Sequence, residues 1–152
     1  MNDKSRSTDA LLDAVAQGCT CGNLRRASRA VTQLFDSILQ PSGLKATQFT
    51  LLVATAKLGP APLTRLAEAL LMDRTTLTRN LKPLERAGLV RIDVGEDRRS
   101  RAISLTPKGR RTLDAALPLW ESAQSRMVDG LGDTRWRRLT NDLSAVSSLT
   151  RP

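Results

Sequence analysis

Histidine and tyrosine are both absent from this chain of 152 residues, and cysteine occurs only twice. Histidine is the commonest general base in enzymes and tyrosine is one of the common acids, so their absence disfavours acid–base catalysis. A structural zinc site takes four ligands, and two cysteines without histidine supply only half of them. The sequence therefore predicts a protein that is not an enzyme and that binds neither a metal ion nor another cofactor.

Long apolar runs are also missing, and no window approaches the ~18–20 apolar residues of a membrane span. The N-terminal stretch MNDKSRSTDALLDAVAQ starts polar and mixed in charge, unlike a signal peptide. Two cysteines do not make the disulfide framework of a secreted protein. We therefore expect a cytoplasmic protein with one compact domain, or one domain with flanking helices.

Positive charge is abundant, with 24 Lys and Arg residues against 15 Asp and Glu residues and a net charge of +9. Residues 74–111 contain eleven of the basic residues and four of the acidic ones, so +7 of the net charge lies in a quarter of the chain. This concentration favours a polyanionic partner such as nucleic acid. A basic surface that is merely solvated is the alternative that charge alone leaves open.

Helical periodicity dominates the first half of the chain. A near-heptad apolar stripe runs from Leu24 to Ile38 and ends at QPSG. Three further helices are predicted over residues 48–58, 63–71 and 74–88, the last of them stopped by Gly88. We expect their N-terminal caps to be Thr47, Thr64 and Asp73, respectively.

The period then changes from helix to strand. LVRIDV (89–94) and RAISLT (101–106) are rich in β-branched residues and are separated by the charged stretch GEDRRS. This pattern predicts a hairpin with an extended loop. Pro83 lies just before it, and we expect this proline to loosen or kink the last turn of the preceding helix.

Helical periodicity returns after the hairpin. Thr106 and Pro107 form a typical helix start, with threonine as the cap and proline at the first helical position. We expect this helix to bend at Pro118 and to end at DGLGD (129–133), and a last helix to begin at about Thr134.

Two short helices joined by a tight turn and followed by a basic hairpin make a winged helix-turn-helix. The predicted fold class is therefore mainly α with a small β-hairpin wing, flanked by N- and C-terminal helices. A helix fits the DNA major groove, where Arg reads guanine and Thr contacts phosphates or thymine methyl groups. An ordinary solvated helix face is the competing interpretation. The predicted recognition residues are Arg74, Thr75, Thr76, Thr78, Arg79 and Lys82.

Two segments resemble the MarR-type transcription regulators. DRRSRAISLTPKG (97–109) is similar to the wing signature of that family, an Asp-x-Arg pair followed by Leu-Thr and a Gly. LAEALLMDRTTLTRNLKPLERAGLV (66–90) is similar to its helix-turn-helix, and the resemblance covers roughly residues 20–150. It implies a homodimer that binds a pseudo-palindromic operator and usually represses.

The resemblance also implies roles for the wing. Arg99 matches the wing-tip arginine that enters the minor groove, and Asp97 matches the acid that orients it through a charge-assisted bond. Arg98 and Arg101 are additional cations of this sequence, and we expect them to contact phosphates.

In this family the first helix and the last two helices form the dimer interface, in agreement with the apolar stripes at both ends of this chain. We therefore assign residues 1–45 and 107–152 to a dimerisation region and residues 46–106 to the DNA-binding domain. An intrachain bundle is the alternative interpretation of the stripes. Dimerisation sets two recognition helices about 34–36 Å apart, one turn of DNA.

The resemblance further implies release of DNA by a small aromatic or anionic ligand that binds between the dimer helices and the DNA-binding domain. No motif in the sequence marks such a pocket. Arg25, Arg26 and Arg29 are candidates to meet an anion, although phosphate or surface contacts are the commoner use of such residues. Two other classes remain open, a non-specific architectural DNA-binding protein and a winged-helix adaptor that binds proteins.

Both cysteines lie in the stretch GCTCGNLRRASR (18–29). If both are helical, Cys19 and Cys21 point about 200° apart, which disfavours a disulfide between them. Extending the apolar stripe backwards places Cys21 on the buried side, as a small core residue. Peroxide-sensing members of the family carry a reactive cysteine eight residues before an Arg, and Cys21 precedes Arg29 by eight. Those sensors pair the cysteine with tyrosines, which this chain lacks, so oxidant sensing through Cys21 stands as an alternative.

Overall fold

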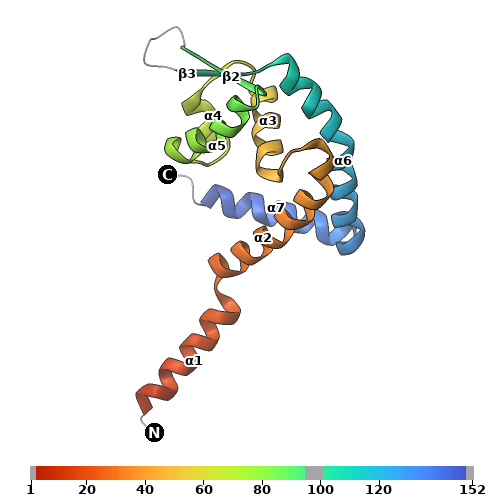
Figure 1. The fold of residues 1–152 in the computed structure, drawn as a ribbon. Helices are drawn as coiled ribbons and strands as arrows, with labels where there is room; N and C mark the ends of the chain where they lie inside the picture. The colour runs from red at the N-terminus through yellow and green to blue at the C-terminus, as the bar shows by residue number, and fades with distance from the viewer. Residues whose placement is uncertain (1–2, 95–100, 150–152) are drawn as a thin grey trace.

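Helices carry most of the chain, and one small sheet lies among them (Figure 1). The computed structural model describes residues 3–94 and 101–149. In chain order the elements are α1 (Asp3–Gly18), α2 (Thr20–Leu39), the 3-10 turn η1 (Gln40–Ser42), α3 (Ala46–Leu58), β1 (Ala61–Pro62), α4 (Leu63–Ala69), α5 (Arg74–Arg86), β2 (Val90–Val94), β3 (Arg101–Leu105), α6 (Pro107–Leu131) and α7 (Asp133–Leu149).

The helices α3, α4 and α5 and the sheet form one lobe, and α6 leads from the sheet down to α2 (Figure 1). α7 turns back beneath this lobe, and α1 extends away from the rest of the molecule (Figure 1). Within residues 3–94 and 101–149, no helix combines the length and the apolar character that crossing a bilayer requires.

The predicted hairpin is confirmed. β2 and β3 pair antiparallel, from Val90 opposite Leu105 to Val94 opposite Arg101, while the loop 95–100 lies outside the described residues. The sheet also has a third strand, β1, which the sequence did not reveal because it is two residues long and ends in proline. β1 pairs with the other side of β3, which is therefore the central strand.

One leucine-rich core holds the lobe together. α5 contributes one complete side of its surface to this core, because Leu77, Leu81 and Leu84 follow each other at helical spacing. The opposite side of α5 is left for solvent. The largest fully buried side chains are Leu39, Leu51, Leu52, Leu66, Leu77, Leu81, Leu84 and Ile103.

Two of the predicted helix caps are wrong. α3 begins at Ala46, one residue before the predicted cap Thr47, because the Ala46 N–H donates to Asp36 Oδ1 of α2 at 2.7 Å. The Lys45 N–H donates to Gln48 Oε1 at 2.9 Å, which completes this helix start. α4 begins directly after Pro62, so Thr64 lies inside the helix rather than at its cap.

The other predicted helix ends are confirmed. Asp73 caps α5 and Thr106 caps α6. Pro83 and Pro118 both lie inside continuous helices. Pro83 has no N–H to donate to the Arg79 carbonyl, but the Ala87 N–H still donates to the Pro83 carbonyl at 3.0 Å. The last turn of α5 is therefore helical, and the expectation that Pro83 loosens it is wrong.

The N-terminal region differs most from expectation. α1 forms a separate helix, and Cys19 is the N-cap of α2, with an extended backbone (ψ 110°) and a thiol sulfur that accepts the Gly22 N–H at 3.4 Å. Cys19 therefore stands before the helix that contains Cys21, and the expectation that both cysteines lie on one helix is wrong. Within this chain Cys21 is exposed and Cys19 is half-buried, which corrects the interpretation of Cys21 as a core residue.

Candidate nucleic-acid interface

The N-terminus of α5 is fixed by hydrogen bonds between Asp73 and Thr76. The Thr76 N–H donates to Asp73 Oδ1 at 2.8 Å, and the Thr76 hydroxyl donates to Asp73 Oδ2 at 2.6 Å. These hydrogen bonds lower the pKa of the Asp73 carboxyl below its ordinary value. The bond from the Thr76 hydroxyl has the larger effect, and the bond from the Thr76 N–H adds to it. Thr76 therefore acts in the cap, and its hydroxyl proton is already in use.

The solvent-facing side of α5 forms a shallow cationic hollow of about 420 Å³. Three cations line it and no carboxylate does, so its surroundings suit an anion. Five of the six predicted recognition residues meet here, and Thr76 does not. The lining residues are Leu63, Arg74, Thr75, Thr78, Arg79 and Lys82.

The two threonines in this hollow differ in what they can offer a ligand. The Thr78 hydroxyl donates to the Arg74 carbonyl at 2.7 Å, so its methyl group and a lone pair stay available. The Thr75 side chain makes no hydrogen bond within the part of the chain that the structure describes. Its hydroxyl is therefore free to donate as well as to accept.

Of the predicted wing residues, the structure describes only Arg101, which is exposed at the start of β3. Asp97, Arg98 and Arg99 lie outside the described residues. On the neighbouring strand the Arg91 Nε donates to Asp93 Oδ2 at 2.6 Å, and this exposed pair partly neutralises the charge of Arg91.

A hydrogen-bonded joint connects the end of α5 to the start of α6. The Thr106 hydroxyl donates to the Gly88 carbonyl at 2.6 Å and accepts the Gly109 N–H at 2.9 Å. Lys108 Nζ donates to the Ala87 carbonyl at 2.8 Å. The backbones also approach so closely that a Cβ built on Gly109 would lie 1.9 Å from the Leu89 carbonyl oxygen. α6 therefore holds the C-terminal end of α5 directly.

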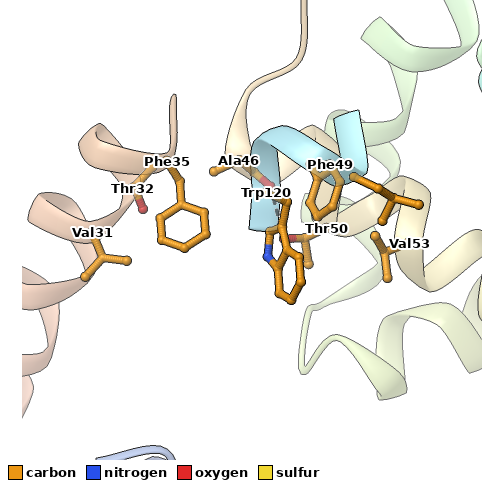
Figure 2. Close-up of a pocket in the computed structure, with 9 residues that line it drawn as sticks. Val31, Thr32, Phe35, Ala46, Phe49, Thr50, Val53 and Trp120 are labelled. Atoms are coloured by element: carbon orange, nitrogen blue, oxygen red, sulfur yellow. Dashed lines mark hydrogen bonds between the residues drawn. The ribbon is translucent and has the colours of Figure 1, made fainter. Parts of the chain in front are cut away.

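A second cavity, of about 410 Å³, lies between α2, α3 and α6 (Figure 2). Phe49 and Trp120 stack in its wall, with ring centroids 6.3 Å apart and planes 15° apart. The indole nitrogen of Trp120 lies on the side that faces Phe35 (Figure 2), and it makes no hydrogen bond within the described residues. The lining residues are Val31, Thr32, Phe35, Ala46, Phe49, Thr50, Val53, Leu117 and Trp120.

Sequence reasoning missed this apolar cavity. The apolar stripes of α2 and α6 were visible, but nothing in either stripe shows that the two helices leave a space beside α3. Neither Arg25, Arg26 nor Arg29 lines the cavity, and its described lining holds no charged side chain. The three arginines are instead exposed on α2.

Comparison with known proteins gives concordant results. The model of the MarR family matches residues 42–100. An uncharacterized HTH-type transcriptional regulator of Bacillus subtilis, YwoH, is 29% identical over 83 residues. That match spans 55% of this chain and 61% of YwoH, less than two thirds of its length.

Solved structures match over a larger share of the chain. The M. tuberculosis transcriptional regulator MosR in complex with DNA is 40% identical, with a TM-score of 0.77, and the match covers 88% of this chain and 99% of MosR. The transcriptional repressor CouR of Rhodococcus jostii RHA1, bound to a 23-mer DNA duplex, is 27% identical, with a TM-score of 0.79 and coverage of 88% and 95%.

The three-stranded sheet, the paired helices α4 and α5 and the likeness to these structures define a DNA-binding transcription regulator of the winged-helix class. This confirms the predicted fold class. Given 40% identity over 99% of MosR and the match of the family model, the chain belongs to the MarR family.

Proposed function

We propose that this protein is a homodimeric repressor that binds a pseudo-palindromic operator in the cytoplasm and leaves it when a small ligand binds. The observation that carries the proposal is the cationic hollow on α5, because it lies on the side of the helix opposite the buried leucines. A recognition helix needs one side fixed to the protein and the other side available to the major groove.

Within this proposal the residues of the hollow divide into two groups. Arg74, Arg79 and Lys82 supply charge for phosphates and donors for guanine, and Thr75 and Thr78 contact base edges or thymine methyl groups. Thr76 is reassigned to the helix cap, because its hydroxyl donates to Asp73. On the wing, we propose that Arg99 enters the minor groove, oriented by Asp97, and that Arg98 and Arg101 contact phosphates.

We further propose that residues 46–106 bind DNA and that residues 1–45 and 107–152 form the dimer. Exposed apolar side chains in the outer segments support this division, since large apolar residues left on a surface mark an interaction site. They are found on α1, α2, α6 and α7, namely Leu11, Leu12, Val15, Val31, Leu117, Leu139, Leu143 and Leu149.

The apolar cavity is the proposed ligand site, and its chemistry narrows the ligand class to neutral aromatic compounds. A carboxylate there would lose its hydration without a cation in the lining to replace it. A flat ring would pack against Phe35 and Trp120, and an acceptor atom on the ligand would receive the indole N–H. Since α2 and α6 meet α3 at this cavity, a ligand would shift the DNA-binding lobe relative to the dimer helices.

The test of DNA binding is the affinity for the operator and for random duplex DNA at several salt concentrations. We expect a specificity ratio above ~10³ and a salt slope that falls by about 0.9 for each phosphate that a variant no longer neutralises. Arg79→Ala is expected to weaken operator binding, whereas the control Lys57→Ala, an exposed cation on α3 outside the hollow, is expected to leave it unchanged. Equal affinity for both DNAs would instead support an architectural protein.

Oxidant sensing is kept as a second candidate because Cys21 is exposed in this chain, where a solution oxidant can reach its thiol. Only the thiolate reacts, so the measurement is operator release by peroxide together with labelling of Cys21 by a thiol reagent. Cys21→Ser should abolish both effects, and Cys19→Ser is the control. Peroxide-insensitive binding by the unmodified protein would eliminate this candidate.

A further inference from the structure

One hydrogen bond joins the long helix α2 to the first residue of α3. Asp36, in the last turn of α2, accepts the Ala46 N–H on its Oδ1 at 2.7 Å, and Lys45 Nζ lies 4.0 Å from its Oδ2. No other hydrogen bond joins α2 to α3 within residues 3–94 and 101–149. The first turn of α3 has no acidic residue of its own. Asp36 therefore supplies both an acceptor and the negative charge that stabilise a helix N-terminus.

Side-chain packing alone does not hold α2 against α3 at this point, because the apolar cavity lies between them. Phe35, the residue before Asp36, and Ala46, which donates the N–H, both line that cavity (Figure 2). The side chain of Asp36 is 31% exposed. Its hydrogen bond therefore bridges the two helices beside a space that their apolar side chains leave open.

The DNA-binding lobe is attached to the proposed dimer helices at two places. α6 joins it through the hydrogen bonds of Thr106 and Lys108 to the end of α5. α2 reaches it through α3, which also contacts α4, α5 and β3. Since α3 moves together with these elements, the direction of its first turn relative to α2 sets the direction of the lobe.

We propose that Asp36 is a positioning residue for DNA binding, which fixes the angle between α2 and α3 and thereby the separation of the two recognition helices. The inference rests on the proposed homodimer and on α5 as its recognition helix. Two such helices must lie about 34–36 Å apart to read successive major grooves. Loss of the hydrogen bond lets each lobe rotate relative to α2, so it weakens the fit to one spacing of half-sites more than the contacts of either lobe with DNA.

The preference for one half-site spacing tests this role, because a residue that only stabilises the fold does not change that preference. The probes are the operator that the wild-type protein selects from random duplex DNA and two derivatives, with one base pair inserted or removed at the centre. Asp36→Ala is expected to lower the affinity for the selected operator by about fivefold or more, as the loss of a helix cap implies. The affinity for the two derivatives should fall less, so the spacing preference declines.

Two variants serve as matched controls. Asp36→Asn removes the same charge but keeps an oxygen that accepts the Ala46 N–H, so it should retain the wild-type preference. Gln48→Ala removes the acceptor of the Lys45 N–H, a hydrogen bond that lies within the start of α3 and does not reach α2. It should lower the melting temperature about as much as Asp36→Ala and still retain the preference. An equal loss of preference in Gln48→Ala would overturn the proposal.

The separation of the two lobes can also be measured without DNA. In a chain with Cys19→Ser and Cys21→Ser, where serine keeps the cap of α2, a spin label is attached at Lys57→Cys. Lys57 is exposed in the last turn of α3 and lies outside the cationic hollow. Asp36→Ala should broaden or shift the distribution of distances between the labels of the two copies, and Asp36→Asn should leave it unchanged.

The outcomes separate this inference from the proposed function. A dimeric wild-type protein that prefers one spacing, but whose preference or label distance is unchanged by Asp36→Ala, would overturn the role of Asp36 alone. A wild-type protein that sediments as a monomer, or that selects no pseudo-palindromic sequence, would overturn the proposed function and this inference together.

Discussion

Lys108, in the first turn of α6, donates a hydrogen bond of 2.8 Å to the carbonyl of Ala87, the C-cap of α5. The last carbonyls of a helix have no partner within the helix, and a lysine supplies one while also matching the negative end of the helix dipole. α5, which is proposed to read DNA, is therefore capped at its C-terminal end by a residue of α6, which is proposed to lead into the dimer. A change in the direction of α6 would move α5 with it.

Lys108→Met is expected to lower the free energy of unfolding by up to about 1 kcal/mol, because it removes one exposed hydrogen bond to a helix end. Operator affinity should also fall, because this hydrogen bond helps to fix the orientation of α5. Lys108→Arg keeps a donor and a charge and serves as the control. Urea unfolding and operator titration of the three proteins measure both effects, and equal values for Lys108→Met and wild type would contradict this role.

Gly109→Ala is expected to destabilise the protein by about 3 kcal/mol or more, because the new Cβ would meet the Leu89 carbonyl oxygen at 1.9 Å. Gly130, also in α6, is the matched control, since nothing lies within 4 Å of a Cβ built there. Gly130→Ala should raise stability by about 0.5–1 kcal/mol through helix propensity. Thermal unfolding compares them, and similar effects of the two substitutions would refute the close approach.

Leu71→Gly is expected to stabilise the turn between α4 and α5. Leu71 has a positive φ of 51°, a conformation that costs a residue with a Cβ roughly 1–2 kcal/mol, and its side chain is 54% exposed. Part of the gain is offset by the greater chain entropy of unfolded glycine, which leaves about 0.5–1 kcal/mol. Leu71→Ala keeps the strain and should not stabilise. A glycine variant less stable than the alanine variant would contradict the strain at this positive φ.

Asp73→Ala is expected to lower the melting temperature by several degrees by removing the cap of α5. Hydrogen bonds from Thr76 lower the pKa of the folded carboxyl below its ordinary value of 3.8. The contribution of the Asp73 carboxylate to folding stability is therefore complete at a pH above the ordinary pKa. It is lost as the pH falls through the lower pKa of the folded state. Asp73→Asn retains a cap but does not titrate. Melting curves from pH 7 to pH 2 should show a smaller acid-induced loss for Asp73→Asn, and an identical loss would refute the assignment.

A neutral aromatic compound is expected to bind the apolar cavity, raise the melting temperature and change the emission of Trp120. The chain has two tryptophans, so Trp136→Phe leaves Trp120 as the only emitter. The carboxylate analogue of the same ring should bind at least about tenfold more weakly, because no cation lines the cavity. Tighter binding of the carboxylate would contradict the proposal of a neutral ligand and would favour an anionic one.

Local signals predicted the parts of this fold that depend on neighbouring residues. The Asp73 cap and the Thr106–Pro107 helix start rest on contacts within a few positions, and the β-branched strands of the hairpin are joined by one short loop; all were confirmed. The start of α3 was not, because its capping carboxylate comes from Asp36, ten residues away on α2.

The remaining features depend on segments that meet only in the folded chain. The apolar cavity requires α2, α3 and α6 to converge, and the close approach of Gly109 requires the backbone of Leu89. The residues that line the cationic hollow were largely predictable to lie together, because helical spacing alone places Arg74, Thr78 and Lys82 on one side of α5. Thr76 does not line this hollow, and its hydroxyl donates to the carboxylate of Asp73, the cap of α5.

The strand order β1–β3–β2 leaves β1 and β2 as the two free edges of the small sheet. Unpaired edges are where strands of other molecules add on and aggregation begins. β1 ends in Pro62, which has no N–H to offer, and β2 carries the ion-paired Arg91 and Asp93. Both edges therefore resist growth by strand addition, which protects the protein against open-ended β-polymerisation.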